Sequence, residues 1–235
     1  MKTLPLSLLL IIGLAGGFPA QQSNYQKEQI RKSSIKRVTS LVGISTKQKF
    51  VSDYDQRGNL VLRVGYGPDG SLSLRESYKY DDKDNVIEAV VGGKKRTYSY
   101  KYNSNGVVLE ARQFDSEGRL RERTEYVNDG EGRVVQSVSY RADGSLIERH
   151  VHTYQGSNAV MQTLVYGPGG NPTSRITYEY EGDRLRRKST YGPNGNLLSQ
   201  NIYKRDHRGL VVEELLLDEK GESVDRTTSD YELYK

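Results

Sequence analysis

The chain has 235 residues, contains no cysteine and carries a formal net charge of +5. Without cysteine it has no disulfide framework and no thiol to which a lipid could be attached. The charge is uneven: residues 1–50 hold eight Lys or Arg and one acid, a balance of +7, whereas residues 51–235 hold 27 basic and 29 acidic residues, a balance of −2. Most of the chain therefore lacks the basic field that attracts nucleic acid, and we expect no nucleic-acid partner.

The first twenty residues, MKTLPLSLLLIIGLAGGFPA, have the layout of a secretory signal peptide. Lys2 precedes an apolar run that ends at Leu14, and small residues follow it. The apolar run is about half of the ~20 residues that a spanning helix needs, so a membrane anchor is the weaker interpretation. We expect the signal peptide to be residues 1–17, with cleavage after Gly17 and cleavage after Ala20 as the alternative. The sequence thus predicts an exported protein that is periplasmic, on the cell surface or secreted.

Residues 21–37 form a basic segment with few turn signals, and we expect a flexible or partly helical leader there. From about Ile35 the apolar and polar residues alternate enough to begin a sheet. We assign residues 38–235 to a single repeat domain.

Each unit of this domain combines a polar turn, an alternating run and an aromatic residue. Turns such as PDG, SEG and PNG end in glycine, which readily adopts the positive φ that such turns require. The turn glycines recur every 12–14 residues from Gly106 to Gly221, and Asn85 is expected to take the glycine position in DDKDNVI. An additional GGKK segment, Gly92 to Lys95, predicts an extra hairpin turn.

Short alternating runs joined by tight turns predict an all-β fold in which neighbours in sequence pair as antiparallel strands. In TYGPNGNL, Tyr191 and Leu197 should face each other across the turn at Gly195. The expected architecture is an antiparallel β-meander of about twelve strands, forming an open sheet that is twisted or coiled.

The segments SDYDQRGNLVL, YKYDDKDNVIEAV, QFDSEGRLRE and YGPNGNLLSQ resemble the YD repeat of RHS-type proteins of bacterial surfaces. MORN-like repeats, which use aromatic, Gly and Leu residues at a comparable spacing, are a second resemblance. Long RHS arrays can enclose a toxin domain, but this array is too short to do so. The resemblance therefore implies an exported β-repeat protein without a toxin.

Tyrosine is the residue that most suggests binding, because the chain has 18 Tyr and no Trp. Tyr66, Tyr166 and Tyr191, which precede the three YGP turns, are candidate ligand-binding residues, since sugars stack on aromatic ring faces. The alternative is that these rings simply cover the packed face of the sheet, with their hydroxyl groups reaching water.

His150 and His152 lie two residues apart on one expected strand, with Glu148 before them on the same face. Two imidazoles in this arrangement could bind one metal ion, although catalysis by zinc would need a third protein ligand that we cannot identify. The alternative is a solvated polar face. Glu213 and Glu214 should point to opposite faces of a strand and cannot act together.

Because no nucleophile or phosphate-loop motif is present, we expect a protein that is not an enzyme and has no cofactor. The hypothesis is a binding or scaffolding module of the bacterial envelope, whose partner is a glycan or a protein. A self-assembling surface protein and a metal-dependent enzyme are the alternatives. We do not expect an integral membrane protein, because runs such as RLRERTEY and RLRRKSTY lack the apolar outer face of a membrane barrel.

Overall fold

The computed structural model describes residues 24–156 and 159–235. The signal peptide predicted for residues 1–17, with both of its cleavage positions, lies outside the described residues. The helix and the strands of the described part are α1 (Asn24–Lys32), β1 (Ile35–Val42), β2 (Gln48–Tyr54), β3 (Leu60–Tyr66), β4 (Leu72–Tyr80), β5 (Val86–Val91), β6 (Lys94–Tyr102), β7 (Val108–Phe114), β8 (Leu120–Asn128), β9 (Val134–Arg141), β10 (Leu146–Gln155), β11 (Ala159–Tyr166), β12 (Pro172–Glu181), β13 (Arg184–Tyr191), β14 (Leu197–Arg205), β15 (Val211–Leu217) and β16 (Ser223–Leu233).

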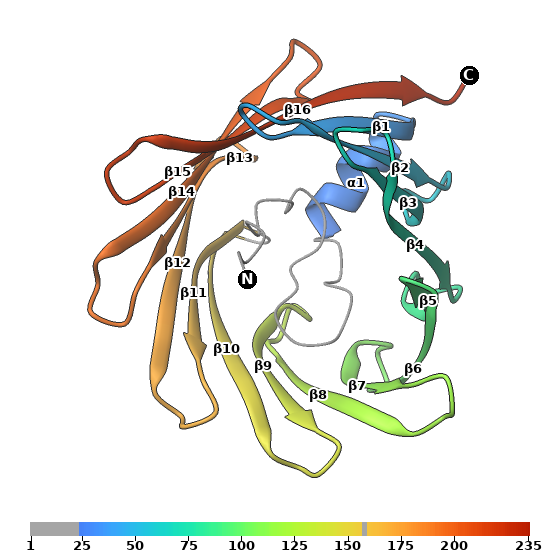
Figure 1. The fold of residues 1–235 in the computed structure, drawn as a ribbon. Coiled ribbons are helices and arrows are strands. Elements are labelled where there is room, and N and C mark those ends of the chain that lie inside the picture. Colours follow the sequence, from blue (N-terminus) through green and yellow to red (C-terminus); the bar gives the residue numbers. More distant parts are fainter. Residues whose placement is uncertain (1–23, 157–158) are drawn as a thin grey trace. The chain divides into compact units, whose positions relative to one another are not determined.

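The strands hydrogen-bond in chain order, and β1 also pairs with β16, so the sixteen strands of the described residues form a closed antiparallel barrel. β1 and β16 run side by side in Figure 1. The expected all-β meander of chain neighbours is present, but the open sheet of about twelve strands is wrong in both count and closure. Closure depends on the pairing of the first and last strands, which satisfies backbone groups that an open sheet would leave at its edges.

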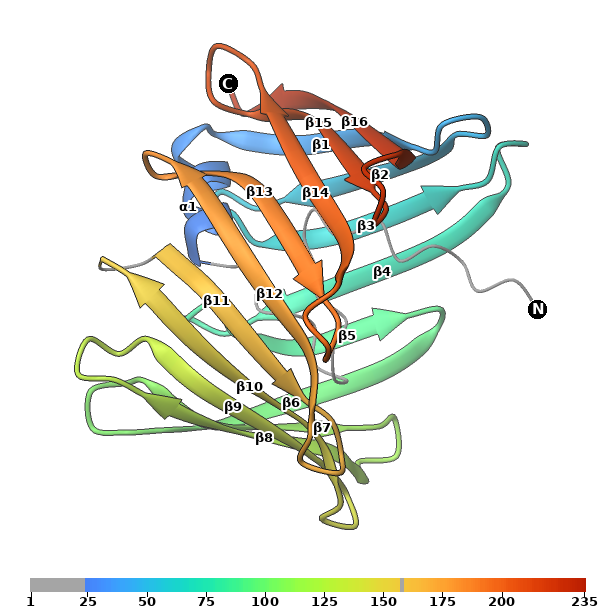
Figure 2. The same ribbon diagram turned by 90° about the vertical axis from the view of Figure 1, so that its left-hand side faces the viewer.

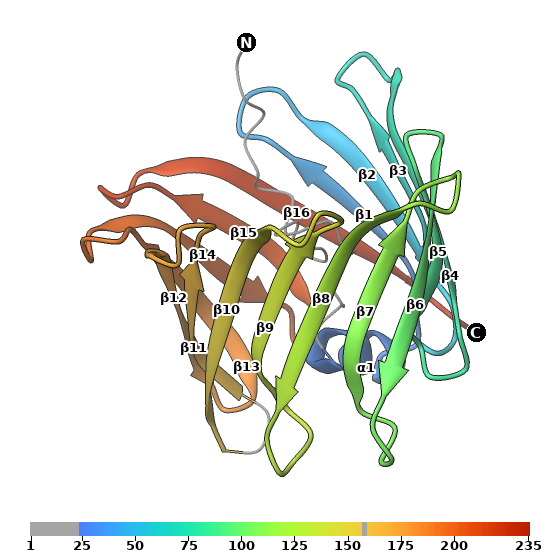
Figure 3. The ribbon, with the colours of Figure 1, turned by 90° about the horizontal axis from the view of Figure 1, so that it is seen from below.

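By compactness the chain divides into two units. The first contains the residues up to Arg96 together with Tyr203–Leu216 and Ser223–Lys235, and the second contains Thr97–Ile202 and Leu217–Glu222. In the first unit β1–β4 lie side by side (Figure 2). In the second unit, β7, β8, β9 and β10 are neighbours in the same way (Figure 3).

The helix α1 belongs to the first unit and lies beside β1 and β2 in Figure 1. Its Ile30 side chain is buried, and Lys27 forms an ion pair with Asp84 at 2.5 Å. A Cβ atom added at Gly58 would lie 2.7 Å from the carbonyl oxygen of Lys27, so only glycine permits this close approach of the helix to the turn after β2. The helix falls far short of a transmembrane span, and the described residues offer no other helical candidate.

Alternation along the strands separates an inner face, which is the more buried one, from an outer face. In the first unit the buried inner residues include Val38, Phe50, Ser52, Tyr54, Tyr78 and Ala89, and in the second unit they include Tyr98, Ala111, Gln113, Glu122, Thr124 and Ser139. Tyrosine and small polar residues therefore supply much of what a hydrophobic core supplies in other proteins.

The turns account for the Asp that recurs directly after the last residue of many strands. Asp55 Oδ1 accepts hydrogen bonds from the backbone N–H groups of Arg57 and Asn59, and Asp81 makes the same pair of bonds with Lys83 and Asn85. This geometry repeats after β6, β8 and β14, where Asn103, Asp129 and Asp206 accept the corresponding bonds.

The positive φ expected of the turn glycines is present from Gly58 to Gly221, and Gly92 and Gly93 form the predicted extra turn between β5 and β6. One assignment is wrong by a residue. Asp84, with a φ of 66°, takes the glycine position in DDKDNVI, and Asn85 follows it. Asp tolerates the left-handed region nearly as well as Asn, so composition alone does not distinguish the two.

Side chains at the ends of even-numbered strands bind the carbonyl group of the residue 20 positions earlier. The Tyr80 hydroxyl donates to the Leu60 oxygen at 2.7 Å, and the Tyr154 hydroxyl donates to the Val134 oxygen at 2.7 Å. Asn128 and Tyr231 make the equivalent bonds to Val108 and Val211. This repeated bond gives the aromatic residue of the repeat a structural role wherever it occurs.

Candidate ligand-binding surface

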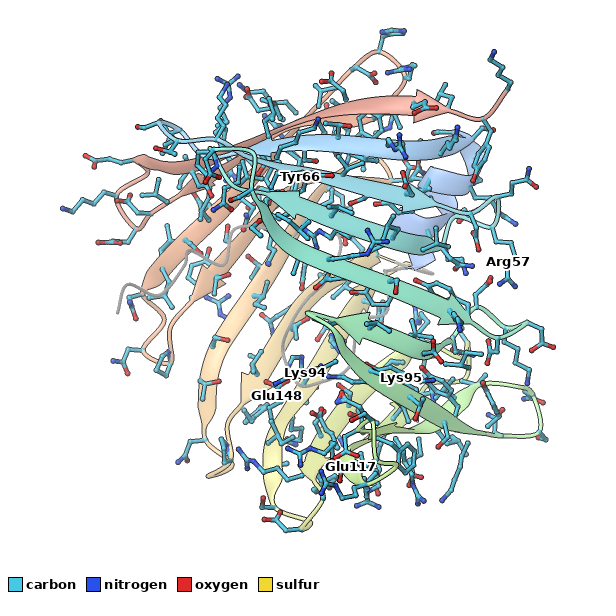
Figure 4. The ribbon with its side chains drawn as sticks, turned by 45° about the vertical axis from the view of Figure 1, so that its right-hand side comes forward. Arg57, Tyr66, Lys94, Lys95, Glu117 and Glu148 are labelled. Carbon is cyan, nitrogen blue, oxygen red and sulfur yellow. The ribbon has the colours of Figure 1, made fainter. Side chains whose placement is uncertain are left out.

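The three tyrosines predicted to bind a ligand all end odd-numbered strands and are half-buried. Tyr66 pairs with Lys49 and Leu72, Tyr166 with Arg149 and Pro172, and Tyr191 with Arg175 and Leu197. The predicted facing of Tyr191 and Leu197 is thus confirmed. Tyr66 lies at the opposite end of the β2–β3 hairpin from Arg57 (Figure 4).

Arginine lies over the rings of both predicted tyrosines of the second unit, Tyr166 and Tyr191. The guanidinium carbon of Arg149 lies 4.0 Å from the ring centroid of Tyr166, and that of Arg175 lies 4.3 Å from the centroid of Tyr191. In each case the Arg is the direct cross-strand neighbour of the Tyr, which is the closest position that a sheet offers. Such cation–π contacts hold the arginine side chain in place and stabilise it by about 0.5–1 kcal/mol at exposed sites.

A third pair, Arg123 and Tyr140, repeats the contact on β8 and β9 at 4.9 Å. Sequence reasoning selected the tyrosines and missed the arginines, which looked like members of a solvated face. The sequence does contain a pattern that marks these arginines: Arg123, Arg149 and Arg175 are spaced 26 residues apart, the length of one hairpin repeat. Recognising it required the strand register, which the sequence does not state.

Two of these pairs form one patch on β10–β13, which we call the Arg–Tyr patch: Arg149, Tyr166, Arg175 and Tyr191. Arg175 faces Leu164 on β11, and Tyr166 stands two residues farther along that strand on the same face. Diagonal neighbours of this kind have Cα atoms about 7–8 Å apart. The register therefore places Tyr166 and Tyr191 on either side of Arg175, and Tyr66 belongs to the first unit.

The two arginines of the patch differ from Arg123 in their charge partners. Arg123 pairs with Glu125 at 2.9 Å and reaches Glu110 at 3.7 Å. Within the described part of the chain, neither Arg149 nor Arg175 has a carboxylate partner, and their contacts are to the tyrosine rings. The patch thus carries two positive charges that no described carboxylate pairs with.

Ion clusters on the outer face of the strands hold their carboxylates ionised. Glu110 pairs with Arg112 at 2.7 Å and with Lys101 at 3.2 Å. Burial opposes the ionisation of Glu110, but the hydrogen bonds from Lys101 and Arg112 outweigh it, so the pKa of Glu110 lies below its usual value.

Two further clusters repeat this arrangement in the first unit. Glu88 pairs with Lys95 at 2.7 Å and with Lys79 at 2.9 Å, and hydrogen bonds from these two lysines lower the pKa of Glu88. Glu213 pairs with Lys204 and Arg226, and these bonds lower its pKa as well. Each central carboxylate thus stands on the outer face between two or more cations.

The inner face carries hydroxyl groups that bond across the strands, together with buried tyrosines. The hydroxyl groups of Thr124 and Ser139 are 2.8 Å apart, and those of Ser40 and Ser229 are 2.9 Å apart. Burial, followed by the charge of Glu122, raises the pKa of Tyr126 to about 12, and burial also raises the pKa of Tyr178. These tyrosines therefore stay neutral, and Tyr178 also forms a hydrogen bond with Thr163.

The two histidines lie on the inner face of β10, where Glu148 and His150 face Ser139 and Ser137 of β9. His150 Nε2 is 3.2 Å from Glu148 Oε1, and His152 Nδ1 is 2.9 Å from the Thr163 hydroxyl. Burial, and then repulsion from His150, lowers the pKa of His152 to about 4. Among the described residues no group of three His, Cys, Asp or Glu side chains is placed to hold a metal ion.

Asp81 and Asp84, in the acidic stretch after β4, stabilise the fold. Asp81 organises its own turn, and Asp84 binds Lys27 of α1 together with Arg57 and Asn59. Glu214 is almost completely buried, whereas Glu213 belongs to the outer ion cluster, so the two neighbours are on opposite faces as expected.

No family model matches the chain, and no curated protein matches it either. Among solved structures, a porin-like protein from Bacteroides uniformis is similar with a TM-score of 0.56 at 12% identity, over 84% of this chain and 98% of that chain. A porin-like protein from Bacteroides vulgatus aligns over the same shares at 12% identity with a TM-score of 0.38. At these identities the first likeness shows a shared barrel fold and nothing more.

The kinship expected from the repeat is therefore wrong. The likeness is to a porin-like barrel, and not to YD/RHS-repeat or MORN proteins. The motif that suggested the kinship, an aromatic residue followed by Asp, two residues and Gly, is the chemistry of a hairpin turn. Any antiparallel meander can use such turns, so the motif indicates local structure and does not identify a family.

Proposed function

We propose that this chain is an exported, non-catalytic protein of the bacterial envelope that works in the aqueous part of that envelope as a binding or scaffolding module. Its partner is an envelope glycan or an envelope protein. The N-terminal sequence, with the layout of a signal peptide, supports export. The barrel fold shared with a porin-like protein is consistent with an envelope setting.

The observation that carries this proposal is the charged outer face. Glu88, Glu110 and Glu213 each stand on a strand, paired with two or more cations, where a membrane barrel presents apolar side chains to lipid. A charged side chain on the lipid face costs about 2–4 kcal/mol at the middle of a bilayer when it is Arg or Lys. A barrel with these clusters is therefore suited to water on its outside.

Barrel closure argues against two alternatives that an open sheet would have allowed. Strand addition from a partner, and self-assembly through sheet edges, both need an unpaired edge strand. Here β1 and β16 pair over Ile35–Val42, so both edges are occupied by the chain itself. The proposed partner accordingly binds through side chains on a face of the sheet.

Cell fractionation tests the proposal. The full-length chain, expressed in a Gram-negative bacterium, should be released by osmotic shock without detergent. The purified protein should leave the conductance of a planar lipid bilayer unchanged. Release only by detergent, together with stepwise conductance, would show a membrane-spanning porin and refute the proposal.

A further inference from the structure

The structure assigns a more specific ligand to the Arg–Tyr patch: we propose that Arg149, Tyr166, Arg175 and Tyr191 bind an acidic polysaccharide. The arginines take its carboxylate, sulfate or phosphate groups, and the tyrosine rings contact its sugar rings. This inference rests on the proposed function, because it names the class of envelope ligand that the module binds.

The first argument is charge. Arg149 and Arg175 are half-exposed and have no carboxylate partner among the described residues, whereas Arg112 on β7 and Arg123 on β8 are both paired with Glu110. An arginine that lies over a ring keeps its N–H groups available for an oxyanion, which it can bind through two parallel hydrogen bonds. The described residues thus hold two cations in place and supply no carboxylate for them.

The second argument is spacing. Arg149 and Arg175 are on β10 and β12, separated by β11, and they face residues two positions apart on β11, Tyr166 and Leu164. Their Cα atoms therefore stand about 10 Å apart across the strands and about 7 Å apart along them. A chain with a negative charge at regular intervals can bind both cations while each arginine stays over its own ring. The pair Arg123–Tyr140 repeats the stacking on β8 and β9, but its arginine is already paired with Glu125, so the patch ends at Arg149.

The third argument separates a polysaccharide from a lipid surface. Tyrosine rings offer flat apolar faces with a polar hydroxyl group, which suits the C–H and O–H groups of sugars. On the same outer face of β12 and β13, Glu179 and Arg187 form an ion pair at 3.5 Å, and a bilayer would have to bury it. A water-soluble polyanion leaves these charges hydrated.

The test is titration of the purified protein with polygalacturonate, with neutral dextran and phosphatidylglycerol vesicles as comparison ligands. We expect binding to polygalacturonate that weakens as salt is raised. In the double variant Arg149→Gln/Arg175→Gln we expect affinity to fall at least tenfold. The matched control is Arg75→Gln/Arg121→Gln, which removes the same charge from two strand arginines that have no ring or carboxylate partner in the described chain, and it should change affinity less than twofold.

A second pair of variants tests the geometry of the patch and guards against loss of folding. Arg149→Lys/Arg175→Lys keeps the charge but cannot stack a planar group on the rings, so its loss of affinity for polygalacturonate should be intermediate. All variants must retain the far-ultraviolet circular dichroism of the parent protein. The inference is overturned if the two double variants to Gln lose affinity equally, if the protein binds vesicles only, or if it does not bind polygalacturonate. Binding to dextran with the same affinity in the parent protein and in all the variants would refute the inference. It would not refute the proposed function.

Discussion

Single side chains decide the hairpins of this barrel. Asp115 Oδ1 accepts the N–H groups of Glu117 and Arg119, and Gly118 closes the same turn with a φ of 77°. The bond from the Arg119 backbone, despite some opposing desolvation, lowers the pKa of Asp115. The Asp therefore stabilises its turn above the pKa of the unfolded chain, and this contribution is lost as the pH falls through the lower pKa of the folded state.

His152 is the residue whose titration should be easiest to observe. Its pKa is lowered from 6.5 to about 4, so the folded protein resists its protonation, and stability is lost as the pH falls from about 6.5 towards 4. At about pH 5 this loss should reach about 2 kcal/mol. Urea unfolding at pH 7.5 and pH 5 should show a smaller drop for His152→Gln, which can still bond with Thr163. An equal drop in both proteins would mean that other groups carry the pH dependence.

At the scale of the element, the sequence of each hairpin specifies its own turn and its own strand pairing. The turn sets the register, and a bulge near it recurs in hairpin after hairpin, as between Gln113 and Phe114 of β7 and between Thr190 and Tyr191 of β13. The tyrosines that end β3, β11 and β13 then point outward, whereas those that end β2, β4 and β6 point inward. One repeated sequence thus builds a stacked Arg–Tyr pair at one end of a strand pair and a tyrosine–carbonyl bond at the other.

Gly118→Ala tests the turn. A Cβ atom there would meet no atom within 4 Å, so the cost is backbone strain alone, about 1–2 kcal/mol for Ala in the left-handed region. Gly118→Asn should lose less, because Asn tolerates that region. Gly130→Ala is the matched control, since Gly130 also has open space and lacks a positive φ, and it should be neutral or slightly stabilising. Thermal unfolding measures all three; equal losses at Gly118 and Gly130 would contradict the assignment.

At the scale of the whole molecule, the pairing of β1 with β16 converts a meander into a barrel. The residues face each other from Arg37 and Glu232 to Val42 and Thr227, and Lys36 adds an ion pair with Glu232 at 3.0 Å. This seam joins segments at the two ends of the described chain. Its formation brings together segments distant in sequence, which makes it the contact with the highest entropic cost of loop closure.

An engineered disulfide tests the seam directly. Ser40 and Ser229 face each other with their hydroxyl oxygens 2.9 Å apart, and the chain has no other cysteine to interfere. Oxidised Ser40→Cys/Ser229→Cys should form a cross-link and gain up to about 4–5 kcal/mol in the chain-entropy model. The out-of-register control Ser40→Cys/Thr227→Cys should cross-link poorly. Maleimide labelling and non-reducing gels report the bond, and thiols that stay free in the first variant would indicate an unpaired seam.

The sequence alone determined the local structure: the all-β class, antiparallel pairing of chain neighbours, the hairpin at Gly92 and Gly93, and the contact of Tyr191 with Leu197. These features depend on residues within one or two turns of each other, and composition and spacing report such contacts directly. Tyr166 and Tyr191 could be selected from the sequence for the same reason, because each directly precedes a Gly-Pro turn. Their contact with a ligand stays a prediction.

Only the tertiary structure decided the rest. It paired β1 with β16, placed Arg149 over Tyr166, and put the ion clusters on the face that a membrane barrel gives to lipid. Each of these results depends on strand register, and a shift of one residue moves a side chain to the other face of the sheet. Closure depends in addition on twist summed over sixteen strands, a quantity to which every strand contributes and which no single motif encodes.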